Sequence, residues 1–398
     1  MMNVSTNIDV KAVNAVKIYS ALRRSRWVSK SELAHEVRLS FASVSNMCTA
    51  LEKAGLVSVK ENSHSTGGRK AAKVSFSPDH AYTLAVDMHH TQHIYLGLLN
   101  LRKELKKSIR FEVSEHDTLE MILAHMKEAY LKLCNGDIPK LLGISVGISA
   151  VHDPNTGILL QSSNPVFERV QLSRYLKDVF PGKLILVDND ANLACLSQRK
   201  ESKTEGKNLL FMFFTQGIGL GVMINGTLYR GSNGFAGELG HLKVSGVNTQ
   251  CKCGGTGCLR TVATLESIAH DLDEIKIIQS MESSVNYAAH LSERYAAGEK
   301  VVVDRLDFTA MKLGEVMADL FDLFNPEEII LGGNMSQLFP HIIHIIKQQC
   351  RTLSNLATEV DIQIRYIDKP TYELVLTGGS EKMFQHWLAS TFPKIPVG

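Results

Sequence analysis

Apolar side chains in the first 80 residues recur at the spacing of helices. From about Val10 to Arg24 the apolar positions lie three or four residues apart, which predicts an amphipathic helix. Ser29 and Glu32 have the spacing of a capping box, so a second helix is expected to begin there and to end near Val37.

A third helix and a hairpin complete this segment. Ser40 can cap the helix, and Gly55 supplies a left-handed stop. The segments Leu56–Lys60 and Lys73–Phe76 predict strands on either side of a basic loop, 62–70, whose glycines permit a tight turn. Three helices followed by such a hairpin are typical of a winged helix-turn-helix, a DNA-binding module.

The residues expected to contact DNA follow from the geometry of this module. Its third helix enters the major groove, and its wing approaches the phosphates or the minor groove. The small polar residues on the outer face of the third helix and the basic residues of the wing are Ser43, Ser45, Asn46, Thr49, Arg69 and Lys70. Two alternatives are a module that contacts another protein and a solvated three-helix unit whose charge is unrelated to DNA.

From about Tyr82 the pattern changes to alternating strands and helices. Leu119–Leu133 is expected to be a helix. The expected strands are Tyr82–Met88, Ile94–Asn100, Lys106–Phe111, Leu141–Ile148, Leu184–Asp188, Leu209–Phe214, Glu327–Leu331 and Glu373–Thr377. The order β-β-β-α-β-α recurs loosely in the second half, which predicts a two-lobed α/β architecture.

Composition and charge sharpen this division. The chain is 44% hydrophobic and 21% charged, as a globular protein is, and it has no apolar run of the roughly 18 residues that a membrane span needs. The first segment lacks the pattern of a secretory signal, so a cytoplasmic protein without membrane insertion is expected. Residues 1–80 hold 12 Lys and Arg against 6 Asp and Glu (+6), which leaves 31 against 35 (−4) for the rest. The positive segment favours DNA binding.

The most specific chemical signal is a group of cysteines in a glycine-rich segment. Cys251, Cys253 and Cys258 follow His241 by 10 to 17 residues. Thiolates and an imidazole are preferred ligands of tetrahedral zinc, and a site with four protein ligands is usually structural, so we predict one Zn²⁺ per chain. The alternative is three incidental cysteines on a loop. The other cysteines are expected to be buried apolar residues: Cys48, Cys134, Cys195 and Cys350.

These segments resemble the ROK family, named for repressors, open reading frames and sugar kinases. The resemblance rests on Thr215–Gly226, Gly234–His241, Cys251–Cys258, Val187–Asn192 and Ile329–Asn334. It implies a winged helix-turn-helix followed by an actin-like, ribonuclease-H-type domain with two lobes and a sugar in the cleft. Members of the repressor branch typically work as dimers or higher oligomers, and a homodimer or homotetramer would match a palindromic DNA operator.

The resemblance also assigns residues to the sugar site. In the family's kinases an aspartate after an asparagine is the catalytic base, and it matches Asp190 after Asn189. The glutamate and histidine of the Glu-x-Gly-His motif hold sugar hydroxyls and match Glu238 and His241, and Asn164 matches a sugar-contacting asparagine less closely. The alternative for Asp190 and Glu238 is that they are surface carboxylates without a ligand.

Departures from the kinase pattern fall on the nucleotide side. The first phosphate loop, Asp-x-Gly-Gly-Thr in kinases, carries His89 and His90 in place of its glycines. The second loop, Gly-Thr-Gly-x-Gly in kinases, has lost its first glycine and carries Gln216 in place of its threonine. Kinases need these loops to position phosphates, so we expect no catalysis, and Asp190 would be a vestigial base.

A further departure concerns the ligand. The family usually has a sugar-binding glutamate where this chain has Arg260. Arg260 either recognises an anionic ligand, such as a sugar phosphate or an acidic sugar, or pairs with Glu238 or Asp190 and closes an empty cleft. His89, His90 and His93 could face an anion, or they could be polar loop residues.

Together these features predict a DNA-binding regulator of carbohydrate metabolism, most simply a repressor controlled by a sugar or sugar-derived effector. The alternatives are a sugar kinase with an added DNA-binding module and a repressor controlled by a partner protein. The expected domains are 1–80, lobe 1 over 81–190 completed by a C-terminal helix at 380–398, and lobe 2 over 191–379.

Overall fold

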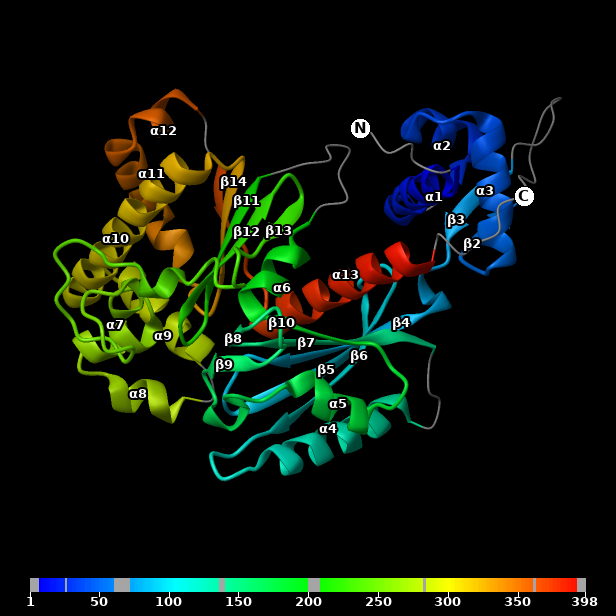
Figure 1. The fold of residues 1–398 in the computed structure, drawn as a ribbon. Helices are drawn as coiled ribbons and strands as arrows, with labels where there is room; N and C mark the ends of the chain where they lie inside the picture. The colour runs from blue at the N-terminus through cyan, green and yellow to red at the C-terminus, as the bar shows by residue number, and fades with distance from the viewer. Residues whose placement is uncertain are drawn as a thin grey trace.

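The structure, a computed structural model, describes residues 7–25, 27–60, 72–135, 140–199, 208–281, 284–360 and 363–391. It contains an N-terminal module and two larger lobes, and a long C-terminal helix runs between them (Figure 1). No helix in the described part of the chain is long and apolar enough to cross a membrane.

The N-terminal module has the expected helices and strands. Its helices are α1 (Asn7–Arg24), α2 (Lys30–Val37) and α3 (Phe41–Lys53). Its sheet has the order β1-β3-β2, formed by β1 (Val28–Ser29), β2 (Val57–Lys60) and β3 (Lys73–Phe76). The short strand β1, which pairs with β3, was not predicted.

Local capping explains the helix boundaries in this module. The Ser29 hydroxyl accepts a hydrogen bond from the Glu32 N–H (3.2 Å), and the Glu32 carboxylate accepts one from the Ser29 N–H (2.8 Å). Ser40 caps α3, and Gly55 has φ +72°, so both predicted signals are confirmed. The tip of the predicted wing, with Arg69 and Lys70, lies outside the described residues.

Lobe 1 is built on the sheet β10-β7-β4-β5-β6. Its strands are β4 (Tyr82–Met88), β5 (His93–Asn100), β6 (Leu105–Glu112), β7 (Leu141–Ile148) and β10 (Ile185–Asn189). The helices α4 (Leu119–Cys134) and α5 (Leu172–Val179) cover one face of the sheet (Figure 1). The small hairpin of β8 (Ala150–His152) and β9 (Leu159–Ser162) follows β7.

Lobe 2 is built on the sheet β13-β12-β11-β14-β15. Its strands are β11 (Leu209–Phe214), β12 (Ile218–Ile224), β13 (Thr227–Tyr229), β14 (Glu328–Gly333) and β15 (Gln363–Tyr366). Helices that sequence analysis did not assign share the apolar core of this lobe: α7 (Leu265–Asp271), α8 (Ile275–Ser280), α9 (Ser284–Ala296), α10 (Lys300–Phe324), α11 (Phe339–Leu353) and α12 (Asn355–Glu359).

The predicted strand Glu373–Thr377 is wrong. These residues belong to α13 (Thr371–Thr391), so the C-terminal helix begins well before the expected residue 380. Leu374, Val375 and Leu376 are all buried, because α13 packs between α6 (Asp190–Ser197) and the sheet of lobe 1. A helix buried on several sides has a continuous apolar run, which cannot be distinguished from a buried strand by its periodicity.

Candidate functional site

The two lobes meet at a cavity of 120 Å³ lined by glycines and polar side chains. Lobe 1 contributes the junction between β10 and α6, and lobe 2 contributes the turn between β11 and β12 together with the segments around His241 and Arg260. The lining includes five of the predicted effector residues: Asn189, Asp190, Glu238, His241 and Arg260. The sixth, Asn164, is not in this lining, and its side chain caps the 3-10 turn Pro165–Phe167 by accepting a hydrogen bond from Val166.

Helix α6 positions the polar groups on the lobe 1 side. The Asn189 side chain caps α6 by accepting a hydrogen bond from the Asn192 N–H (3.2 Å). Asp190 is the first residue of the helix and only 4% exposed, and burial raises its pKa to about 6. The result is a buried carboxyl group at the cavity that can exchange a proton near neutral pH.

A glycine allows the lobe 2 carboxylate to approach. Gly237 has φ +98°, and a Cβ atom there would collide with the carbonyl oxygen of Leu220. This conformation, which favours glycine, brings Glu238 to the cavity. Partial burial and the neighbouring Asp190 raise the pKa of Glu238. Two carboxyl groups from opposite lobes therefore face the same space, where they can accept hydrogen bonds from hydroxyl groups.

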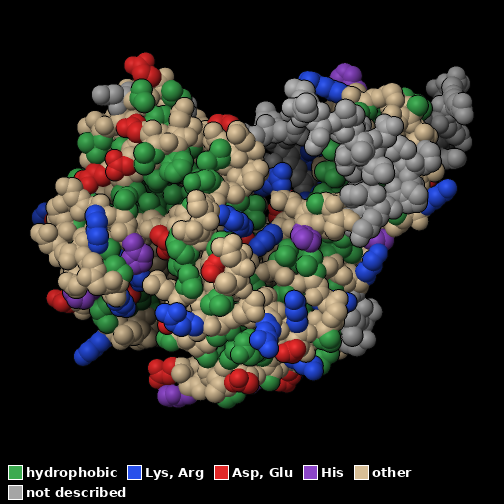
Figure 2. Space-filling model, viewed as in Figure 1, with side chains coloured by type: hydrophobic (Ala, Val, Ile, Leu, Met, Phe, Trp, Pro, Cys, Tyr) green, Lys and Arg blue, Asp and Glu red, His purple; other side chains and the backbone are tan. Residues whose placement is uncertain are grey.

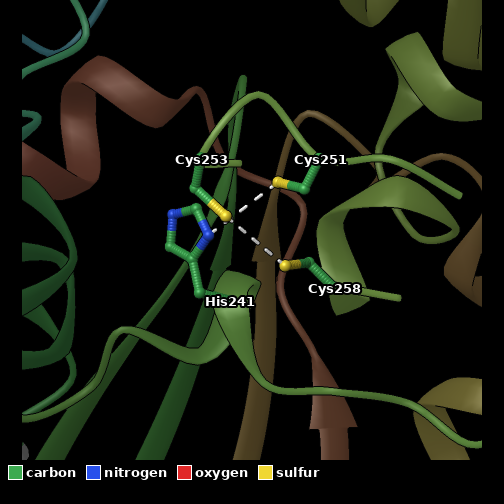
Figure 3. A group of neighbouring side chains, drawn as sticks. All are labelled: His241, Cys251, Cys253 and Cys258. Atoms are coloured by element: carbon green, nitrogen blue, oxygen red, sulfur yellow. Dashed lines mark hydrogen bonds between the residues drawn. The ribbon is translucent and has the colours of Figure 1, made fainter. Parts of the chain in front are cut away.

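His241 and the three cysteines converge on one point (Figure 3). Their ligand atoms all lie within 4.8 Å of one another. The Cys253 and Cys258 sulfurs are 3.7 Å apart, and the Cys251 sulfur is 3.9 Å from His241 Nδ1. A metal bound tetrahedrally at about 2.3 Å would place two sulfurs about 3.8 Å apart, so this cluster can hold one metal ion.

The metal cluster and the cavity share His241. Lys243 Nζ lies 3.0 Å from the Cys258 sulfur, where an ammonium group stabilises a thiolate. The other cysteines, Cys48, Cys134, Cys195 and Cys350, are buried as expected. A metal at this cluster would fix the His241 ring at one wall of the cavity.

In the segment that corresponds to the first phosphate loop, the imidazole of His89 is buried. His89 is 3% exposed, and its Nδ1 lies 2.7 Å from both carboxylate oxygens of Asp87. Burial alone would lower the pKa of His89, but the neighbouring Asp87 outweighs burial and raises the pKa. The His90 and His93 rings stack 5.2 Å apart, and burial lowers the pKa of His90 to about 4, which leaves that ring uncharged at neutral pH.

Gln216 and Thr91 join the two predicted phosphate loops directly. Gln216 Nε2 donates a hydrogen bond to Thr91 Oγ1 (3.1 Å), which connects lobe 2 to lobe 1. Arg260 donates to the backbone carbonyl of Gln216 (3.0 Å). Among the described ion pairs, Arg260 has none with Glu238 or Asp190.

Sequence analysis missed the ion pair between Asp188 and Arg230. The Arg230 guanidinium binds both oxygens of Asp188 (2.6 and 2.5 Å), across the boundary between the lobes. The two residues are 42 positions apart, and no motif connects them. Only the folded arrangement brings β10 and the segment after β13 together.

The predicted DNA-contacting residues of α3 lie toward solvent. Ser43, Asn46 and Thr49 are exposed and Ser45 is half-buried, whereas the intervening Val44, Met47, Cys48 and Leu51 form the core. The Ser45 hydroxyl accepts a hydrogen bond from Lys30 of α2 (3.3 Å). The helix therefore presents one polar face, as its sequence pattern predicts.

Comparison with known proteins shows which family the chain belongs to. A model of the ROK family matches residues 83–366. The chain belongs to the ROK family. The family resemblance seen in the sequence is thus confirmed, and with it the two-lobed α/β fold.

Individual relatives of this ROK chain include regulators and kinases. It is 24% identical to the xylose repressor of Bacillus spizizenii, over 87% of this chain and 89% of that protein. It is 29% identical to the glucokinase of Halalkalibacterium halodurans, but over only 64% of this chain and 81% of that protein. A solved ROK family transcriptional regulator, a homologue of the E. coli MLC protein, has the same fold with a TM-score of 0.77 and 21% identity, and the match covers 97% of this chain and 99% of that one.

Proposed function

We propose that this ROK chain is a DNA-binding transcriptional repressor of carbohydrate-metabolism genes, whose operator affinity changes when a sugar or sugar-derived effector binds between the lobes. One observation carries the proposal: the same chain has two features. Its N-terminal module presents an exposed polar helix, and its two lobes both contribute carboxyl groups to one cavity. The similarity to the xylose repressor covers 87% of the chain, whereas the similarity to the glucokinase covers 64%.

On the DNA side, the N-terminal module acts as a winged helix-turn-helix. Helix α3 enters the major groove of the operator and contacts it through Ser43, Ser45, Asn46 and Thr49, and the wing contributes Arg69 and Lys70. The chain acts in the cytoplasm as a homodimer or homotetramer, and two modules related by twofold symmetry read a palindromic operator.

On the effector side, the carboxyl groups of Asp190 and Glu238, with Asn189 and His241, bind sugar hydroxyls. Arg260 lies in the same lining, and its contact with the Gln216 carbonyl leaves further N–H donors for an anionic group. A sugar phosphate or an acidic sugar is therefore the favoured class of effector.

The Cys-His cluster holds one structural Zn²⁺ through His241, Cys251, Cys253 and Cys258. The ion supplies no chemical step, and its role is to hold the segment that carries His241 against the cavity. All four ligands come from the protein, so the site leaves no open position for a reacting water.

Kinase activity is absent in this proposal. The first phosphate loop carries His89, whose imidazole lies against Asp87, in place of a glycine, and Gln216 of the second loop donates a hydrogen bond to Thr91 of the first. An ATP-consumption assay with D-glucose and D-xylose should therefore give the same background rate for the wild type and Asp190→Asn. Turnover near the 1 s⁻¹ or more that is common for kinases, lost in Asp190→Asn, would replace this proposal with the kinase alternative.

The test of the repressor function begins with selection of duplexes that bind the full chain from a random DNA pool. Affinity for a selected duplex is then measured with D-xylose, D-glucose, their phosphates and D-glucuronate. We expect sequence-specific DNA binding that Asn46→Ala weakens, and we expect one class of sugar to change the affinity for DNA.

Arg260→Glu should abolish the response to an anionic sugar, and a response to neutral sugars alone would refute the anion assignment. Specific DNA binding that responds to no sugar would favour control by a partner protein.

A further inference from the structure

Helix α13 belongs to two apolar cores at once. Its first half packs against α6 and the lobe 1 sheet, with Val375 in the core beneath α6. Its second half contributes Phe384 and Leu388 to the core of the N-terminal module, where Phe384 lies beside the ring of Tyr19 from α1 (6.1 Å). The helix therefore runs without interruption from the cleft to the N-terminal module (Figure 1).

A buried ion pair attaches this helix to the N-terminal module. Arg23 of α1 binds the Glu381 carboxylate (2.9 Å), and both side chains are almost completely buried, at 2% and 4% exposure. The Arg23 guanidinium also lies 3.9 Å from the centre of the Phe384 ring. Burial would raise the pKa of Glu381, but Arg23, Lys103 and Arg199 outweigh it and lower the pKa to about 2. Glu381 is therefore ionised whenever the protein is folded at ordinary pH.

A second, partly buried ion pair attaches the same helix to the cleft. Lys382 lies 2.8 Å from the Asp188 carboxylate and donates a hydrogen bond to the carbonyl of Val187 (3.1 Å). Asp188 is 2% exposed and precedes Asn189 and Asp190, which line the cavity. Its other partner is Arg230 of lobe 2, so Asp188 is held between lobe 2 and α13.

We propose that α13 transmits the state of the cleft to the N-terminal module through these two ion pairs on consecutive residues, Asp188 with Lys382 and Arg23 with Glu381. This inference rests on the proposed function for its biological meaning, although the physical coupling can be measured without an effector. A change in the separation of the lobes alters the distance between the Arg230 guanidinium and the Asp188 carboxylate. Because Asp188 is bound to Lys382, the change reaches α13 and then Arg23.

The surroundings of the N-terminal module leave it room to respond. A cavity of 1530 Å³ separates α1 and α2 from the edge of lobe 2, with Lys17 and Arg38 on one side and Asn225 and Thr227 on the other. In Figure 2 the described parts of lobe 2 and of the N-terminal module stand apart at the top of the molecule. The N-terminal module packs against α13 and against the segment that contains Leu101 and Arg102. Arg102 donates a hydrogen bond to the Ser25 carbonyl (2.9 Å).

The test is a double-mutant cycle read by hydrogen exchange in the full chain without ligand. Arg230→Met removes the lobe 2 partner of Asp188, and we expect amide exchange in α1 to rise roughly threefold to thirtyfold, the range for coupling through packed side chains. In the Lys382→Met background the same substitution should leave exchange in α1 unchanged, because the connection to α13 is already broken. Slow amide exchange in β11 shows that a variant is folded. If Lys382→Met does not fold, Lys382→Gln is used in its place.

The matched control is Lys300→Met, which removes a surface ion pair with Asp304 of similar length (2.9 Å) on α10. This control should leave exchange in α1 unchanged, and Arg230→Met should act in its background as it does in the wild type. The proposal is overturned if Arg230→Met has no effect on α1, or if its effect is equally large with and without Lys382. A chain that fails to bind DNA but shows this coupling would refute the proposed function and leave the inference intact.

Discussion

Gly378 of α13 lies directly against the backbone carbonyl of Leu193 in α6, so closely that a Cβ atom at residue 378 would collide with that oxygen. Helix α6 carries Asp190 at its first turn, and α13 continues into the core of the N-terminal module. This crossing of the two helices therefore sets how the cavity is positioned relative to α1.

Gly378→Ala should destabilise the protein. The obstacle is backbone, which cannot rotate away as a side chain can, so α6 and α13 must separate. We expect a loss of about 1–3 kcal/mol in the free energy of unfolding, measured by urea denaturation. Gly217→Ala is the control, since a Cβ atom at residue 217 meets nothing within 4 Å. Equal stability of the two variants would contradict the close crossing.

Asp190 should make stability depend on pH in the acid range. Burial raises the pKa of Asp190 from its usual 3.8 to about 6. Between these values the folded protein keeps a proton that the unfolded chain releases, so the free energy of unfolding falls as pH rises through this window. Asp190→Asn removes this contribution, and its stability relative to the wild type should improve by up to about 3 kcal/mol between pH 4 and pH 7. Parallel stability curves for the two proteins would disprove the shifted pKa.

Metal content should depend on the Cys-His cluster alone. Wild-type protein purified without chelator should contain about one zinc per chain, measured by elemental analysis, and Cys251→Ser should contain almost none and melt at a lower temperature. Cys350→Ala is the control, because it also alters a buried cysteine but should keep its zinc. Retention of zinc in Cys251→Ser would show that the ion binds elsewhere.

The bridge between Thr91 and Gln216 should hold the lobes together in the absence of ligand. Thr91→Val keeps the shape of the side chain and removes the hydroxyl that accepts the hydrogen bond from Gln216. The bond lies at the surface, so stability should fall by no more than about 1 kcal/mol, but exchange of the amides at the turn between β11 and β12 should rise. Unchanged exchange at that turn would mean that the bridge does not restrain the lobes.

Local patterns predicted much of the fold. Capping residues such as Ser29 and Ser40 act on amides three positions away, and the apolar residues Val74 and Phe76 of β3 stand two positions apart, so both signals can be recognised in a single segment. The residues Cys251, Cys253, Cys258 and His241 are also close in sequence, so their spacing alone indicates a common site. The strand expected at Glu373–Thr377 failed because burial on several sides removed the periodicity that distinguishes a helix.

The amino-acid sequence by itself determined the module with its capped helices, the family, and the chemical types available to the cleft and the metal cluster. Only the tertiary structure decided which distant polar groups meet: the ion pairs of Arg230 with Asp188 and of Arg23 with Glu381, and the hydrogen bond of Gln216 with Thr91. The physical reason is that capping and periodicity act over a few residues, whereas an ion pair between residues 42 or 358 positions apart forms only where the packing of whole elements excludes water and brings both groups together.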